Sequence, residues 1–219
     1  QFCIKNILQL KEYSKFNIEI SLPGKKKYKI KNIKIPLLGL HNIRNATAAA
    51  AVASTIGIST KIIKQALKEF KGVQRRFNKI FTFKETIFFD DYAHHPTEIT
   101  QLLNGVRQSY KKEKIICVFQ PHRISRINNL KKEFSYSFKK ANNVILCPVF
   151  SAGEKLKLNF SYLDFAKKII RNSKVNVFLV KNESQLAKYV KQNIYGKKIV
   201  IGMGAGSISN WIRNLPKLL

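Results

Sequence analysis

The chain has 219 residues, of which 45% are hydrophobic and 24% are charged, so it can bury a core and is not an intrinsically disordered segment. Lysine and arginine number 41 against 12 acidic residues, which gives a formal net charge of +29. This excess suggests a polyanionic partner such as nucleic acid or an anionic membrane surface. The basic residues are spread along the whole chain, however, and fall mostly at expected loops and helix ends. We therefore interpret the basic residues as solvated surface side chains that reflect the general residue usage of the chain. The alternative is a basic nucleic-acid-binding module.

The three cysteines, Cys3, Cys117 and Cys147, are odd in number, and the last two lie in apolar runs. This pattern predicts reduced core residues of a cytoplasmic protein in preference to metal or redox sites. No apolar run approaches the length of about eighteen residues that a membrane span needs. Because the sequence starts at Gln1 without a methionine and in the middle of an expected element, we expect it to be the carboxyl part of a larger protein.

The first third of the chain predicts β-strands followed by two helices. Strands are expected over residues 2–8, 16–22 and 28–35, with a turn at Pro23-Gly24. An alanine-rich helix is expected over residues 45–56, before Gly57. A second helix places apolar residues on one face, namely Ile62, Ile63, Ala66, Leu67 and Phe70. We expect a domain boundary near Phe70, which gives domains at residues 1–70 and 71–219.

From Gly72 onward, expected strands alternate with expected helices. The strands cover residues 77–83, 86–89, 115–119, 144–147, 175–180 and 199–201. The helices cover residues 96–110, about 128–140, 162–170, 183–194 and 208–215. Alternation at this length is typical of an α/β fold with a mostly parallel sheet that helices cover on both faces.

One stretch, residues 90–98 with the sequence DDYAHHPTE, places two aspartates and two histidines directly after an apolar strand. Pro96 suits the first turn of the helix that follows. In open α/β sheets, ligands bind beyond the carboxyl ends of the strands, and the start of a helix adds backbone N–H groups that favour anions. The stretch therefore predicts a functional site at this edge of the sheet.

All four histidines of the sequence fall in expected loops, whereas histidines without a special role could fall anywhere. His41 precedes the alanine-rich helix, His94 and His95 follow one strand, and His122 follows another. Nearby, Arg123 and Arg126 are three residues apart, so on a helix they would share a face and could bind one carboxylate or phosphate from two sides. The histidine turns are therefore candidates for a shared site.

Two further patterns are less specific. Asp90 and Asp91 lie close to His94 and His95, but adjacent histidines point in different directions and no spaced ligand set completes a zinc shell, so we expect no metal site made by this chain alone. The glycine-rich segment 202–206 follows a strand and opens a helix, which suits either phosphate approach or a tight turn. The chain has no Walker-type phosphate loop.

Five segments, in this order along the chain, resemble the motifs of the Mur ligases. Residues 39–46 resemble G-x-H-N-x-x-N-A, residues 72–77 resemble G-V-x-R-R-F, and residues 90–98 resemble D-D-Y-[AG]-H-H-P-x-E. Residues 119–126 resemble F-Q-P-H-R-[YF]-[ST]-R, and residues 151–154 contain A-G-E. Ser207 departs from the pattern, where an acid or amide would be expected, as do Val149 and Phe150, where Tyr-Pro or similar often appears.

The resemblance implies an ATP-dependent ligase of peptidoglycan precursor synthesis, which serves cell-wall biogenesis, cell shape and cell division. The segment Gln120-Pro121-His122-Arg123 favours the members that add L-alanine to UDP-N-acetylmuramate over those that reattach murein tripeptide, in which an E-P-R-S type segment would be expected. In the implied reaction the muramate carboxylate is phosphorylated to an acyl phosphate, which the amine of L-alanine attacks.

The resemblance also implies which residues bind the nucleotide. The amides of Asn42 and Asn45 match the donor and acceptor edge of adenine, and His41 belongs to the same motif. Arg76 would neutralise phosphate charge during transfer, and Asp91 would accept hydrogen bonds from ribose hydroxyls.

The amino-acid site would use a second group of residues. By the same resemblance, Arg123 and Arg126 would hold the alanine carboxylate, while His94 and Tyr92 shape the pocket so that the amine lies against the acyl phosphate. The amine must be deprotonated, and either His94 or His122 would assist.

The resemblance covers only the end of a central ATP-binding domain, at residues 1–70, and a Rossmann-like carboxyl domain, at residues 71–219. We expect the UDP-sugar domain, the phosphate loop and the acid and histidine that hold magnesium to lie outside this chain, and the fragment to be inactive alone. A non-catalytic remnant that serves as a binding partner fits the same residues.

Overall fold

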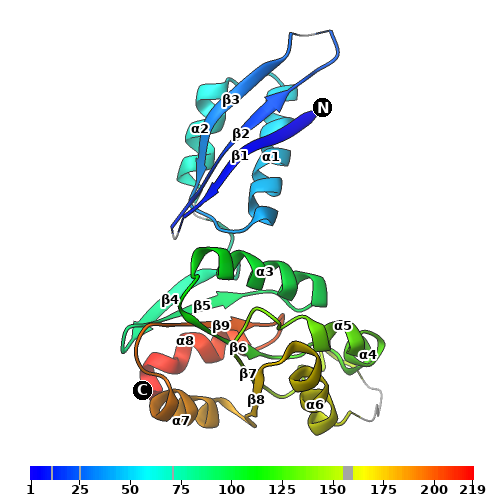
Figure 1. The fold of residues 1–219 in the computed structure, drawn as a ribbon, viewed down its shortest axis with the longest axis vertical. Helices are drawn as coiled ribbons and strands as arrows, with labels where there is room; N and C mark the ends of the chain where they lie inside the picture. Colours follow the sequence, from blue (N-terminus) through cyan, green and yellow to red (C-terminus); the bar gives the residue numbers. More distant parts are fainter. Residues whose placement is uncertain (11, 25, 71, 155–159) are drawn as a thin grey trace. The chain divides into compact units, whose positions relative to one another are not determined.

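The chain is described here by a computed structural model, which covers every residue except 11, 25, 71 and 155–159 (Figure 1). The described residues form two compact units, Gln1–Val73 with Asn104–Lys111, and Gln74–Leu103 with Lys112–Leu219. The helix α3 (Pro96–Ser109) is divided between them. The expected domains at residues 1–70 and 71–219 stay a prediction, and residue 71 lies outside the described residues.

The first unit contains an antiparallel sheet in the order β1-β2-β3, formed by β1 (Phe2–Gln9), β2 (Ser14–Ile20) and β3 (Tyr28–Ile35) (Figure 1). Phe16, Ile18 and Ile20 alternate along β2 and are completely or almost completely buried. They share a core with apolar residues of two helices, α1 (Leu40–Thr55) and α2 (Thr60–Glu69). The two helices therefore cover the apolar face of the sheet.

The helix α1 begins earlier than the sequence predicted, at Leu40 instead of residue 45. Gly39 precedes it with φ 91°, and its carbonyl oxygen accepts hydrogen bonds from the backbone N–H groups of Asn42 and Ile43. A glycine can adopt this φ at little cost, so the chain turns into the helix there. The expectation that His41 lies in a loop is therefore wrong, because His41 belongs to the first turn of α1.

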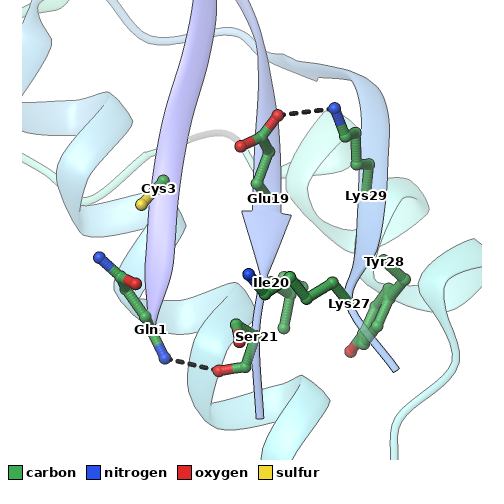
Figure 2. Close-up of a pocket in the computed structure, with 8 residues that line it drawn as sticks. All are labelled: Gln1, Cys3, Glu19, Ile20, Ser21, Lys27, Tyr28 and Lys29. Carbon is green, nitrogen blue, oxygen red and sulfur yellow. Dashed lines mark hydrogen bonds and ion pairs between the residues drawn. The ribbon is translucent and has the colours of Figure 1, made fainter. Parts of the chain in front are cut away.

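A hollow on the same sheet is shown in Figure 2, lined by Gln1, Cys3, Glu19, Ile20, Ser21, Lys27, Tyr28 and Lys29. Nζ of Lys29 lies 2.7 Å from Oε1 of Glu19, and the amino group of Gln1 donates to the carbonyl oxygen of Ser21 at 2.6 Å. None of the predicted site residues lines this hollow.

The second unit contains a six-stranded sheet in the order β4-β5-β9-β6-β7-β8. The strands are β4 (Asn78–Phe83), β5 (Thr86–Asp91), β6 (Lys114–Phe119), β7 (Asn143–Leu146), β8 (Asn176–Leu179) and β9 (Lys198–Met203). Only the pair of β4 and β5 is antiparallel, and every other neighbouring pair in the sheet is parallel. The predicted α/β fold with a mostly parallel sheet is confirmed.

Helices pack on both faces of this sheet. On one face, α7 (Glu183–Asn193) and α8 (Ile208–Leu218) share a core with alternate residues of the central strands, among them Ile116 and Val118. Phe119 points to the other face, where its ring centroid lies 5.8 Å from that of Phe134 in α5 (Lys131–Tyr136). Phe134 in turn contacts Phe165 of α6 (Tyr162–Ser173). None of the described helices has the length and apolar character to cross a membrane.

The helix expected at about residues 128–140 is wrong in its bounds. The structure has two short helices instead, α4 (Ile124–Asn129) and α5, which are separated at Leu130 with φ −116°. The early start at Ile124 is stabilised by Glu154, whose Oε2 accepts the backbone N–H of Ile124 at 2.8 Å. This contact joins residues thirty positions apart in the sequence, so no local pattern could have indicated it.

Asp91 ties the end of β5 to the segment that precedes β4. Its Oδ2 accepts the backbone N–H of Phe77 at 2.8 Å, and its Oδ1 accepts that of Ala93 at 2.7 Å. The side chain is almost completely buried. Desolvation raises the pKa of Asp91 from 3.8 to about 6, and the two backbone hydrogen bonds and the charge of Arg76 only partly offset this effect.

This shift predicts a pH dependence of stability. The folded chain binds a proton at Asp91 more tightly than the unfolded chain, so this contribution is fully present below pH 3.8 and is lost as the pH rises through about 6. Because Asp91→Asn removes the titration, the free energy of unfolding of the wild type relative to the variant should fall by on the order of 3 kcal/mol between about pH 4 and about pH 7.

Urea unfolding at several pH values, followed by the fluorescence of Trp211, measures this difference, since Trp211 is the single tryptophan and lies in the second unit. If the difference in free energy of unfolding between wild type and variant stays constant or grows with rising pH, the backbone hydrogen bonds of Asp91 already compensate for the burial of its carboxylate.

Candidate active site

Three parallel strands of the second unit end at the same level. Asp91 at the end of β5 pairs with Met203 at the end of β9, and Met203 pairs with Phe119 at the end of β6. Backbone hydrogen bonds continue past these ends, from Gly204 N–H to the Asp91 carbonyl at 3.3 Å and from Gln120 N–H to the Met203 carbonyl at 2.9 Å. The loops that carry the predicted site residues therefore start side by side.

The glycine-rich segment at the end of β9 is held by two side chains. Nη2 of Arg75 donates to the carbonyl oxygens of Gly204 at 2.6 Å and Gly206 at 3.1 Å. Oε1 of Gln120 accepts the first N–H of α8, from Ile208, at 3.0 Å. These contacts hold the segment in a tight turn through two carbonyl oxygens and one N–H group, and its role in phosphate approach stays a prediction.

His94 lies in the turn between β5 and α3 and is held by Glu98. Oε2 of Glu98 accepts the backbone N–H of His94 at 3.0 Å and that of His95 at 3.1 Å. Nδ1 of His94 lies 3.3 Å from the same Oε2 and 3.0 Å from the carbonyl oxygen of Tyr92. Although burial alone would raise the pKa of Glu98, the backbone N–H of His94 and the charge of His94 lower it below its ordinary value.

His122 lies beside His94 at the end of β6. The two ring centroids are 5.6 Å apart with an interplanar angle of 64°. The His122 ring also stacks with Phe150 at 5.6 Å, and the backbones of the two residues form a parallel bridge. Nη1 of Arg126 lies 3.3 Å from Nδ1 of His122. Burial, followed by the charge of Arg126, lowers the pKa of His122 below its ordinary value, which favours the neutral imidazole.

Arg123 and Arg126 do not share a helical face, contrary to the expectation. Arg123 precedes α4 with φ 65°, so it stands outside the helix, whereas Arg126 lies within it. The Arg123 backbone N–H donates to the carbonyl oxygen of Phe150 at 2.9 Å, and its side chain is exposed. The carboxylate of Glu154 accepts from the Ser125 hydroxyl as well as from the start of α4, so it fixes the helix that carries Arg126.

Tyr92, at the same edge of the sheet, lies next to the side chains of Arg75 and Arg76. The guanidinium carbon of Arg75 lies 4.7 Å from the centroid of the Tyr92 ring, and that of Arg76 lies 6.0 Å from it. The Tyr92 ring also meets the His94 ring edge to face at 5.1 Å. Arg75 is engaged with the glycine segment, whereas Arg76 is exposed and can face an anion.

The predicted site residues thus fall into two groups. In the second unit, contacts run in series from Tyr92 to His94, His122 and Arg126, and Arg76 lies beside Tyr92. Arg123 follows His122 in the sequence, and Asp91 precedes Tyr92. His41, Asn42 and Asn45 all lie on α1 of the first unit, and Nδ2 of Asn42 donates to the Leu38 carbonyl at 2.8 Å. The individual roles of these residues stay predictions.

Four supporting residues were not among the residues predicted for the site. Glu98, Gln120 and Glu154 lie within the recognised motifs and bind backbone groups of the site. Asp90 is completely buried, and its Oδ2 accepts from the Ser209 hydroxyl at 2.5 Å and lies 3.3 Å from Nη2 of Arg213 in α8. Position within a motif was the available signal, but residue type alone could not separate a backbone-binding carboxylate from one that binds a ligand.

A search for clusters of three or more histidine, cysteine, aspartate or glutamate side chains that could hold a metal ion found none in the part of the chain that the structure describes.

Comparisons with known proteins agree with the fold and the motifs. A family model described as "Mur ligase, glutamate ligase domain" matches residues 75–206. The UDP-N-acetylmuramate–L-alanine ligase of Pelagibacter ubique is 67% identical over 218 residues, which cover 100% of this chain and 47% of that protein. The ligase of the same name from Bartonella tribocorum is 37% identical over 194 residues, which cover 89% of this chain and 41% of that protein.

Solved structures show the same fold. The UDP-N-acetylmuramate-alanine ligase of Thermotoga maritima matches with a TM-score of 0.79 and 25% identity, over 99% of this chain and 45% of that protein. A murein peptide ligase of Psychrobacter arcticus matches with a TM-score of 0.68 and 21% identity, over 99% of this chain and 44% of that protein. The chain thus spans about half the length of the relatives it matches. Since the family model covers more than half of the chain, and the motifs at the strand ends agree with it, the chain belongs to the Mur ligase family.

Proposed function

We propose that this chain is the carboxyl-terminal portion of an ATP-dependent ligase that joins L-alanine to UDP-N-acetylmuramate. The observation that carries the proposal is the contact between His94 and His122 beside Arg126, because it brings two of the motifs together at the carboxyl edge of the sheet. The names of the relatives from Pelagibacter ubique and Bartonella tribocorum support the choice of substrates.

The amino-acid site is assigned to the cationic side of this cluster. Arg126 is half-buried next to His122, and Arg123 is exposed beside it, so both can donate charge-assisted hydrogen bonds to the carboxylate of L-alanine. The neutral imidazole of His122 can donate a hydrogen bond to the same carboxylate, and it adds no positive charge that would repel the two arginines. Tyr92 and His94 border the same space, which would hold the amine of L-alanine near the reacting carboxyl group.

The nucleotide is assigned to the other side of Tyr92. ATP, when bound, supplies the phosphoryl group, and the exposed guanidinium of Arg76 fits the phosphate charge. Each Asp91 carboxylate oxygen accepts one backbone hydrogen bond, which leaves further acceptor capacity for a ribose hydroxyl. On the first unit, His41, Asn42 and Asn45 stay the residues that the resemblance predicts for nucleotide binding. The magnesium ligands would belong to the other half of the protein.

The first unit presents a surface that suits the other half of such a ligase. Ala48, Ala49, Val52 and Ile56 follow the spacing of one helical face on α1, and they lie opposite its buried face. Val52 is 65% exposed and Ile56 is 71% exposed. A helix that is apolar on both faces is typical of a protein interior. We therefore infer that α1 is covered by the amino-terminal half that the longer relatives contain.

The activity can be tested by joining the amino-terminal half of the Pelagibacter ubique ligase to this chain. The chimera should release phosphate from ATP only when UDP-N-acetylmuramate, L-alanine and magnesium are all present, and the product should gain the mass of one alanine residue. The 219-residue chain alone should show no turnover. ATP hydrolysis by the chain alone, or a folded chimera that does not respond to L-alanine, would contradict the proposal.

The amino-acid site predicts a selective effect of Arg123→Ala in the chimera. Loss of a charge-assisted hydrogen bond to a carboxylate costs about 1.5–3 kcal/mol, so the Michaelis constant for L-alanine should rise roughly 10- to 150-fold. The Michaelis constant for ATP should change by less than about threefold, because the variant loses an interaction with L-alanine and none with ATP. Steady-state kinetics with each substrate varied in turn measures both constants.

Arg171→Ala is the matched control, because Arg171 is an exposed arginine in the last turn of α6 and belongs to no motif. It should leave both constants unchanged. Equal increases for L-alanine and ATP in Arg123→Ala would remove Arg123 from the amino-acid site.

A further inference from the structure

The contacts of the His94 ring define which nitrogen carries the proton. Its Nδ1 faces two groups that can only accept, the carbonyl oxygen of Tyr92 at 3.0 Å and the carboxylate of Glu98 at 3.3 Å. A neutral imidazole can satisfy them only when the proton is on Nδ1. Nε2 of His94 then has a free lone pair and can act as a proton acceptor.

The contacts of the His122 ring require the opposite arrangement. Its Nδ1 lies 3.3 Å from Nη1 of Arg126, and a guanidinium group can only donate. Nδ1 of His122 must therefore accept, which places the proton of the neutral ring on Nε2. His122 can donate from Nε2 but has no lone pair there to take a proton from a substrate.

We propose that Glu98 is a positioning residue that holds His94 as the Nδ1–H tautomer, so that Nε2 of His94 accepts a proton from the amino group of the incoming amino acid, while Arg126 holds His122 as a Nε2–H donor. This division of roles rests on the proposed function for its chemistry, whereas the two tautomers follow from the contacts alone. It decides between the two histidines, either of which the sequence allowed as the group that assists deprotonation.

The proposed reaction step begins with a proton transfer from the amino acid to His94. One proton of the alanine ammonium group moves to Nε2 of His94, which becomes imidazolium and is stabilised by the Glu98 carboxylate at Nδ1. The freed electron pair on the amine nitrogen forms the bond to the carboxyl carbon of the acyl phosphate, and the carbon–oxygen bond to phosphate breaks. A second proton leaves the nitrogen with the departing phosphate, so that the product is a neutral amide. The imidazolium then returns its proton to the solvent. His122 donates to an oxygen of the reactants during this step.

Glu98 is suited to this role because one oxygen, Oε2, contacts both the His94 ring and the backbone of the turn. Oε2 also accepts the backbone N–H groups of His94 and His95, so the turn and the ring are fixed by one carboxylate. Its pKa lies below the ordinary value despite the effect of burial, because of the His94 backbone N–H and the charge of His94, so the carboxylate stays ionised. Carboxylates that orient a metal-bound histidine typically affect metal affinity or activity about 10- to 100-fold, and we expect an effect of similar size for Glu98.

The tautomers can be measured on the 219-residue chain by long-range proton–nitrogen NMR of the histidine rings at a pH where both rings are neutral. His94 should show a protonated Nδ1 and His122 a protonated Nε2. Glu98→Ala should convert a substantial fraction of His94 to the other tautomer and leave His122 unchanged. Arg126→Ala should release His122 and leave His94 unchanged.

Two variants serve as controls in the same spectra. Glu98→Gln keeps an oxygen acceptor and should retain most of the His94 tautomer, whereas Glu133→Ala removes an exposed acid of α5 and should change neither ring. Dispersed backbone spectra of each variant show that it is folded. A wild-type His94 that carries its proton mainly on Nε2 would overturn the proposal.

The chemical role is tested separately in the chimera. Glu98→Ala should lower kcat roughly 10- to 100-fold and change the Michaelis constant for L-alanine by less than about threefold, and Glu98→Gln should recover most of kcat. A rise in that constant with unchanged kcat would assign Glu98 to binding and overturn the proposal. A wild-type chimera without activity would count against the proposed function, while the NMR result would still decide the tautomers.

Discussion

The parallel register of β5, β9 and β6 is the constraint on which the candidate active site depends. Side chains alternate between the faces of a strand, so a slip of one residue would move Asp90 or Asp91 to the opposite face of the sheet. The register is continued beyond the strands by backbone hydrogen bonds at Gly204, Gln120 and Cys147. The site loops leave the sheet from fixed positions because these bonds hold the first residue of each loop.

Three acidic residues of the site bind backbone N–H groups. Asp91, Glu98 and Glu154 each accept at least two backbone N–H groups. Within the described part of the chain, Arg123 and Arg126 form no ion pair with an acid. The guanidinium groups of Arg123 and Arg126 are therefore not held by a carboxylate and can bind an anionic reactant.

The sequence allowed prediction of the sheet and of which loops carry the site, because apolar runs of strand length alternate with amphipathic helices and leave polar motifs at the strand ends. It did not allow prediction of local conformations that depend on distant partners. Arg123 adopts φ 65° and α4 starts at Ile124 because Phe150 and Glu154 bind this segment. The sequence predicts a loop at His41 because the alanine-rich pattern begins at Asn45, whereas α1 begins at Leu40, directly after Gly39.

The glycines after β9 show how packing can account for a pattern that also suits phosphate binding. A Cβ atom at Gly204 would lie 2.7 Å from the backbone oxygen of Gln120, and φ is 148° at this position. A Cβ atom at Gly206 would lie 2.5 Å from both the Gln120 side chain and the Phe150 ring. Distances below 3.0 Å are incompatible with a side chain unless neighbours move. These glycines are thus explained by the close approach of Gln120 and Phe150.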